Sequence, residues 1–142
     1  MEQALLFAKD MLQEEGFTCV LCRGDQVVTS HHRGVRPLMD CLDSGRDFSG
    51  FFAADKVVGR ATAFLYCLLG VRQIYAQVLS KGAQQVLEEY GIPYFYDCLV
   101  PGIRNRNDTG PCPMEAATSN FTTPQEALVA IRETLEKLRI ES

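Results

Sequence analysis

Apolar residues recur at helical spacing over the first 15 residues of the chain. Leu5, Ala8, Met11 and Leu12 share one side of such a helix, and charged residues take the opposite side. Gly16 follows directly, as glycine often does just past a helix end. The pattern predicts an amphipathic helix that lies on a core.

Two short runs rich in β-forming residues come next, at 17–22 and 26–30. Gly24 and Asp25 stand between them and readily adopt the positive φ of a tight turn, which predicts an antiparallel hairpin. Residues 37–44 then begin with Pro37 and end before Gly45, the pattern of a short connecting helix.

From residue 49 onward, strand-like and helix-like segments alternate. The expected strands are 49–54, 72–79 and 93–100, and the expected helices are 55–70, 80–91 and 123–139. Alternation of this kind indicates a parallel βαβ core. Together with the hairpin it predicts an α/β fold of three layers with a mixed five-stranded sheet, in a single domain of residues 1–142.

Two of these helices have distinct patterns. The helix expected from Asp55 is apolar on nearly every side, so it should be covered all round. The last helix opens with Thr123 and Glu126 at capping-box spacing and should cover one face as an amphipathic outer layer. Its expected buried stripe is Leu128, Ile131, Leu135 and Leu138.

Charge and composition narrow the class of protein. The chain has 142 residues, a net charge of −4 and no long cluster of Lys or Arg, which argues against a nucleic-acid polymer or an anionic membrane as the main partner. No apolar run approaches the length of a membrane span. Glu2 stands where a secretion signal would be basic, so we expect a cytoplasmic protein whose six cysteines are reduced thiols.

Candidate ligand groups follow the expected parallel strands, at the edge of the sheet where such folds bind ligands. They are Asp55 and Lys56 after one strand and Ser80 and Lys81 after the next. Asp55 could hold a ligand hydroxyl, act as a base or cap the following helix, and these roles are compatible. Ser80 has the same two interpretations, with helix capping favoured.

A loop expected at 101–122 is longer than most structureless connections, and such loops are often functional. Arg104 and Asn105 in it suit a phosphate, carboxylate or ribose, although a solvated turn is the alternative. Cys112 is the best candidate nucleophile, with Glu115, three residues later, or Asp55 as its catalytic partner. The alternative is that Cys112 fills space in the core, as the other five cysteines are expected to do.

Metal and redox motifs are weak in this sequence. Cys19 and Cys22 have CxxC spacing but lie on an expected strand, where residues three apart point to opposite faces. No second pair completes a zinc site, and His31 and His32 are expected at the surface. We therefore expect neither a metal nor a cofactor.

The order of elements resembles the cytidine-deaminase-like fold. Segments 34–38, 54–61, 91–93 and 105–115 also resemble an uncharacterised bacterial family of that fold, a domain of unknown function; ADKVVGRA and CPME are the specific pieces. Zinc deaminases place His-x-Glu or Cys-x-Glu at the start of the helix that is expected here from Asp55, and Pro-Cys-x-x-Cys at the start of the next. This chain has 55–57 (DKV) and 80–82 (SKG) there.

The resemblance implies a nucleoside- or nucleotide-sized ligand near Asp55, without zinc and without deaminase activity. The expected ligand-binding residues are Asp55, Lys56, Ser80, Lys81, Arg104, Asn105, Cys112 and Glu115. A second hypothesis is a group-transfer or hydrolytic enzyme that uses Cys112. A third is a homo-oligomeric interaction module, built on the outer helices, with a vestigial pocket.

Overall fold

A computed structural model describes residues 1–104, 110 and 112–141 of the chain. Its elements in chain order are α1 (Gln3–Glu15), β1 (Cys19–Arg23), β2 (Gln26–Ser30), α2 (Arg36–Asp43), β3 (Phe52–Val58), α3 (Arg60–Leu69), β4 (Gln73–Ser80), α4 (Lys81–Glu89), β5 (Tyr94–Val100), α5 (Pro113–Thr118) and α6 (Pro124–Glu141).

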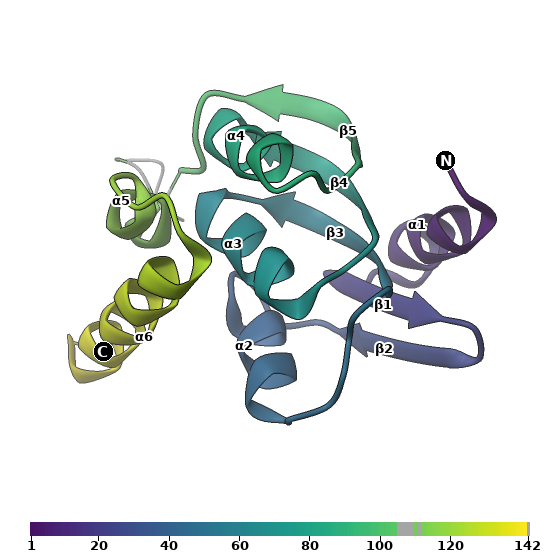
Figure 1. Ribbon diagram of the computed structural model, residues 1–142, viewed down its shortest axis with the longest axis horizontal. Coiled ribbons are helices and arrows are strands. Elements are labelled where there is room, and N and C mark those ends of the chain that lie inside the picture. Colours follow the sequence, from purple (N-terminus) through teal and green to yellow (C-terminus); the bar gives the residue numbers. More distant parts are fainter. Residues whose placement is uncertain (105–109, 111, 142) are drawn as a thin grey trace.

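The five strands form one mixed sheet in the order β2-β1-β3-β4-β5 (Figure 1). The hairpin is antiparallel, and Arg23 pairs with Gln26 so that only Gly24 and Asp25 form its turn. β1 is antiparallel to β3, whereas β3, β4 and β5 are parallel to one another. The predicted α/β class and mixed five-stranded sheet are confirmed.

Helices cover both faces of this sheet. α1 packs alone on one face, against β1, β3 and β4, and ends at Gly16 with φ of 72°. α2, α3 and α4 lie on the other face, and α5 and α6 pack on α3 from outside, at the end of the molecule opposite α1 (Figure 1). The last helix is therefore an outer layer as predicted, although it packs on other helices and not directly on the sheet.

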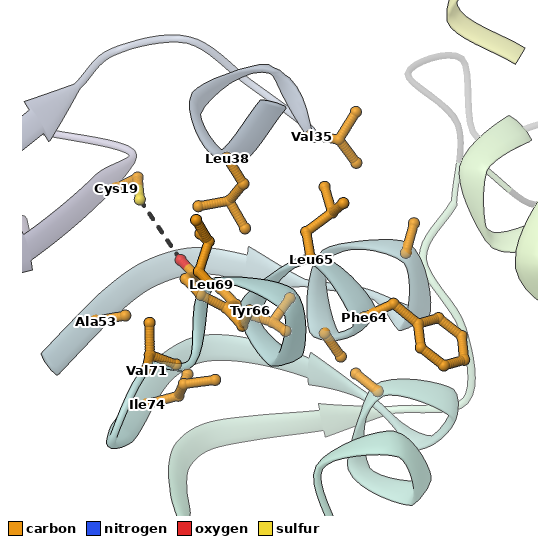
Figure 2. Packing of buried hydrophobic residues seen from close by; sticks show 14 of the residues in the cluster. Cys19, Val35, Leu38, Ala53, Phe64, Leu65, Tyr66, Leu69, Val71 and Ile74 are labelled. Atoms are coloured by element: carbon orange, nitrogen blue, oxygen red, sulfur yellow. Dashed lines mark hydrogen bonds between the residues drawn. The ribbon is translucent and has the colours of Figure 1, made fainter. Parts of the chain in front are cut away.

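α3 is the centre of the larger core. Phe64, Leu65 and Tyr66 on three successive sides of the helix are each fully buried. Figure 2 shows side chains of α2, β3 and β4 packed around them, among them Leu38, Ala53 and Ile74. The prediction of a helix covered all round is confirmed for this segment.

The start of α3 was predicted wrongly. The helix begins at Arg60, and Asp55 lies inside β3, which continues to Val58. Val57 and Val58 are β-branched and pair with Val78 and Leu79 of β4, which favours the strand. Gly59 in extended conformation then precedes the first helical residue.

The segment 101–122 was also predicted wrongly as structureless throughout. It contains the short helix α5, whose first residue is Pro113. Among the described residues, no helix is both long and apolar enough to cross a membrane.

Candidate functional site

A cavity of about 880 Å³ lies where β3, the segment after β2, and helices α3, α5 and α6 come together. Its polar lining comes mainly from residues 31–33, 36, 55–56, 104, 112 and 115. Its apolar lining includes Val35, Val57, Ile103, Met114, Leu135 and Leu138. The volume falls within the range of small-molecule sites, which are typically apolar clefts with a few placed polar groups.

Asp55 is a buried charged residue of the described cavity lining, with 8% of its surface exposed. The hydroxyl of Tyr66 donates a hydrogen bond to its Oδ2 at 2.6 Å, and the backbone N–H of Val57 donates to its Oδ1 at 3.2 Å. The carboxylate does not cap α3, so the capping interpretation of Asp55 from the sequence is wrong. It is held within the strand and faces α3 from the sheet.

The strand around Asp55 departs from simple alternation. Ala53 and Val58 both reach the core beneath α3, although residues five apart on a regular strand point to opposite faces. Their partners Ile74 and Leu79 on β4 show the same change. The interruption leaves Val57 43% exposed at the cavity and lets its N–H bond the Asp55 carboxylate.

Burial dominates the electrostatics of Asp55. Loss of solvent raises the pKa of its carboxyl to about 7, although the hydrogen bonds from Tyr66 and from the backbone at Val57 and Lys56 lower it. Burial also raises the pKa of Tyr66 and of Cys19 well above their usual ranges. At neutral pH the Asp55 carboxyl is therefore close to its midpoint, while the thiol and phenol stay protonated.

Glu115 links the cavity wall to the beginnings of α3 and α4. Its Oε1 accepts hydrogen bonds from the N–H of Arg60 at 2.6 Å and from the hydroxyl of Ser80 at 3.1 Å. Ser80 also accepts from the N–H of Ala83 and so caps α4, as predicted. The same carboxylate oxygen lies against Gly59, in the space that a Cβ atom on that residue would fill. Glu115 is thus fixed by the fold, and its Oε1 is already engaged.

Arg60 holds the outer helices in place through its guanidinium group. It donates hydrogen bonds to the carbonyl oxygens of Thr118 at 2.9 Å, Gly82 at 3.3 Å and Phe121 at 2.6 Å. These acceptors belong to α4, to α5 and to the link that leads into α6. The wall of the cavity formed by α5 and α6 therefore depends on a residue of α3.

The structure brings most of the predicted site residues together. Asp55, Lys56, Arg104, Cys112 and Glu115 line the one cavity. Ser80 and Lys81 do not belong to the described lining of the cavity. Ser80 is fully buried and reaches the cavity only through Glu115, and Lys81 is exposed on α4. Asn105 lies outside the described residues.

The cysteines divide into three groups. Cys19, Cys22 and Cys41 are buried, Cys67 and Cys112 are half-buried, and Cys98 is exposed on the edge strand β5. Cys19 and Cys22 belong to cores on opposite faces of the sheet, which confirms their predicted separation. The prediction that Cys98 is a packing residue is wrong. In the described part of the chain, no three metal-ligating residues are grouped.

Sequence reasoning missed several residues of the site. Arg33, Arg36 and Thr62 line the cavity, and Tyr66 supports Asp55 from beneath. His31 and His32 were expected at the surface, where they do lie, but they also form part of the cavity rim. The signal for the arginines was available: Arg33 and Arg36 stand on either side of a Gly-Val pair, directly before a predicted helix.

Comparison with known proteins identifies the family. A family model described as "TM1506: Domain of unknown function (DUF1893)" matches residues 7–135. The chain belongs to the DUF1893 family. None of the curated proteins matches it.

One solved DUF1893 structure is similar over nearly the whole chain. The crystal structure at 2.70 Å resolution of the DUF1893 family protein TM1506 from Thermotoga maritima is 26% identical, with a TM-score of 0.84. The match covers 96% of this chain and 92% of that chain. The DUF1893 fold is therefore common to both proteins, and the function of this member has to be argued from its own site.

Proposed function

We propose that this DUF1893 protein binds a nucleoside- or nucleotide-like small molecule in the cavity beside Asp55. The observation that carries the proposal is a buried carboxyl group, held by Tyr66 and the backbone of Val57, that lines a cavity of about 880 Å³. A carboxyl near its midpoint can accept a hydrogen bond when ionised or donate one when protonated, which suits the amide and amino edges of a base or the hydroxyls of a ribose.

The apolar lining supports the same class of ligand. Val57, Ile103 and Leu135 offer flat contact area for a base, and polar groups are confined to a few positions. We further propose that the architecture is a variant of the cytidine-deaminase-like fold, on the order of elements and on the placement of the cavity at the carboxyl end of β3.

Deaminase activity is not part of the proposal. Zinc deaminases need His or Cys ligands and a glutamate at the start of the helix that corresponds to α3. The residues at that point are Val58, Gly59 and Arg60, and the space in front of Gly59 is taken by the Glu115 carboxylate. Six free thiols suit a reducing compartment, so we propose the cytoplasm as the location.

The alternative of catalysis by Cys112 has less support. Cys112 lines the cavity, but the carboxylate oxygen Oε1 of its proposed partner Glu115 is bonded to Arg60 and Ser80. Asp55, the other carboxyl group offered as a partner, is likewise bonded to Tyr66 and to the backbone of Val57. We therefore favour binding, and thiol labelling separates the two.

A panel of ligands tests the proposal. The melting temperature would be measured with the four common ribonucleosides and their 5′-monophosphates, on the wild type, on Asp55→Asn and on Asp10→Asn, an exposed carboxylate of α1. We expect at least one compound to raise the melting temperature of the wild type and of Asp10→Asn, with at least tenfold weaker binding to Asp55→Asn. No shift with any compound at millimolar concentration, or equal binding to Asp55→Asn, would contradict the proposal.

A further inference from the structure

Arg33 and Arg36 are the two arginines of the described chain without a partner for their guanidinium groups. The other described arginines have interactions within the chain: Arg23, Arg46, Arg60, Arg72, Arg104, Arg132 and Arg139. Arg33 and Arg36 nevertheless both line one cavity, together with Lys56, whose ammonium group also has no hydrogen-bond or ion-pair partner in the described chain. Three unsatisfied cations thus gather at one place.

The charge balance of this cavity is opposite to that of the whole chain. Among the described residues, four Lys and Arg line it against two Asp and Glu, in a protein with a net charge of −4. Both acids are already engaged by internal hydrogen bonds: Asp55 by Tyr66 and the backbone of Val57, and Glu115 by Arg60 and Ser80. The cavity mouth therefore attracts anions despite the acidic chain.

The backbone holds the two arginines at this mouth. Gly34 has a φ of 68°, a conformation that L side chains rarely adopt, and so turns the chain between them. Val35 is buried with 4% of its surface exposed, which anchors the turn while the arginines on either side remain exposed. Arg36 is also the first residue of α2, where the helix dipole is positive and a cation is disfavoured unless an anion is near.

We infer that Arg33 and Arg36 bind a phosphate group, so that the ligand of this cavity is a nucleotide and not a nucleoside. The inference rests on the proposed function and specifies the ligand further. The guanidinium group presents paired donors that match phosphate oxygens, and Lys56 adds a compact charge beside Asp55. The phosphate then lies at the exposed mouth and the base at the buried carboxyl.

Isothermal titration calorimetry at fixed ionic strength tests the inference. Each of the four ribonucleosides is compared with its 5′-monophosphate on the wild type, on the double variant Arg33→Gln/Arg36→Gln, and on Arg72→Gln as a control. Arg72 is exposed and pairs with Glu2, so its substitution changes the charge without touching the cavity mouth. We expect the monophosphate of the bound nucleoside to bind the wild type and Arg72→Gln at least tenfold tighter than the nucleoside.

The double variant should lose that tenfold advantage while its nucleoside affinity stays within about twofold of the wild type. Equal affinity of the wild type for nucleoside and monophosphate would overturn the inference and leave the proposed function intact. An equal loss in Arg72→Gln would overturn it as well, because the effect would then come from net charge. Failure of every compound to bind the wild type would overturn both this inference and the proposed function.

Discussion

The hydroxyl of Tyr66 lies between the carboxylate of Asp55 and the thiol of Cys19. It donates to Asp55 Oδ2 at 2.6 Å and is 3.5 Å from Cys19 Sγ, and the latter contact is drawn in Figure 2. The three residues come from α3, β3 and β1, so the contact ties the central helix to both strands. Asp55 and Cys19 line the cavity, whereas Tyr66 is fully buried behind them.

Asp55→Asn should change how stability depends on pH. The pKa of Asp55 is about 7 in the folded protein and about 3.9 in an unfolded chain. Between these values the folded state holds a proton that the unfolded state has lost, so the free energy of unfolding falls as pH rises from about 4 to 7 and is then constant. The side chain of the Asp55→Asn variant does not titrate, so the free energy of unfolding of that variant does not fall for this reason.

Urea unfolding at pH 5 and pH 8 measures the effect. Relative to the wild type, Asp55→Asn should gain about 3 kcal/mol more at pH 8 than at pH 5, since about two pH units separate pH 5 from the folded pKa of about 7 and each corresponds to about 1.4 kcal/mol. Asp10→Asn, on the exposed side of α1, should show no such difference. A pH-independent difference between Asp55→Asn and the wild type would mean that Asp55 has an ordinary pKa.

Tyr66→Phe should destabilise the protein by about 1.5–3 kcal/mol at pH 8, because it leaves a buried ionised carboxylate without its side-chain donor. The pKa of Asp55 should rise further, since the Tyr66 hydroxyl lowers it. Urea unfolding and a carboxyl-carbon NMR titration give the two values. Tyr94→Phe removes a hydroxyl bonded to exposed Glu88 and should cost under about 0.5 kcal/mol. Equal costs for the two variants would contradict this account of Asp55.

Gly59→Ala and Glu115→Ala should be coupled. Glu115→Ala removes the acceptor for the Arg60 N–H and should cost about 1–3 kcal/mol. Gly59→Ala should be costly in the wild type, because its Cβ would overlap the Glu115 carboxylate. In the Glu115→Ala background the same change should cost at least about 1 kcal/mol less, as a double-mutant cycle would measure. Additive costs would show that the carboxylate does not occupy this space.

Thiol labelling separates binding from catalysis by Cys112. Cys98 is exposed, so it should react fastest in the native protein, and Cys98→Ser should remove the fast phase. Half-buried Cys112 should then react more slowly, with no acceleration over a free thiol. The measurement is the rate of modification at pH 7, with the site identified by mass spectrometry. A Cys112 that reacts faster than a free thiol in Cys98→Ser would revive the hypothesis of a nucleophilic enzyme.

The parts of the fold that were predictable are set by local chemistry. The turn at Gly24 and Asp25 depends on a few neighbouring residues, and so does the cap at Thr123, whose hydroxyl accepts from the N–H of Glu126 and donates to its Oε1. The structure contains both. The start of α3 was not predictable in this way. Residues 55–58 fit either a helix or a strand, and pairing with β4, 21 residues later, decides for the strand.

The same distinction between local chemistry and contacts of distant segments applies to the candidate site. Asp55, Cys112 and Glu115 were found because their chemistry and position stand out in the sequence. Tyr66 was not, because a tyrosine within an apolar helix is indistinguishable from a packing residue until the opposite strand is in place. The Arg60 N–H that donates to Glu115 is similarly distant, 55 positions earlier in the chain.

Arg60 has a consequence for which substitutions the cavity wall of this protein tolerates. Its guanidinium group binds carbonyl oxygens of Thr118, Gly82 and Phe121, and every one of these acceptors is a backbone atom. Substitution at the acceptor positions leaves such bonds intact, whereas substitution of Arg60 breaks all of them. The side chains of α5 and α6 can therefore change while the bonds that hold these helices on α3 persist, as long as Arg60 itself is kept.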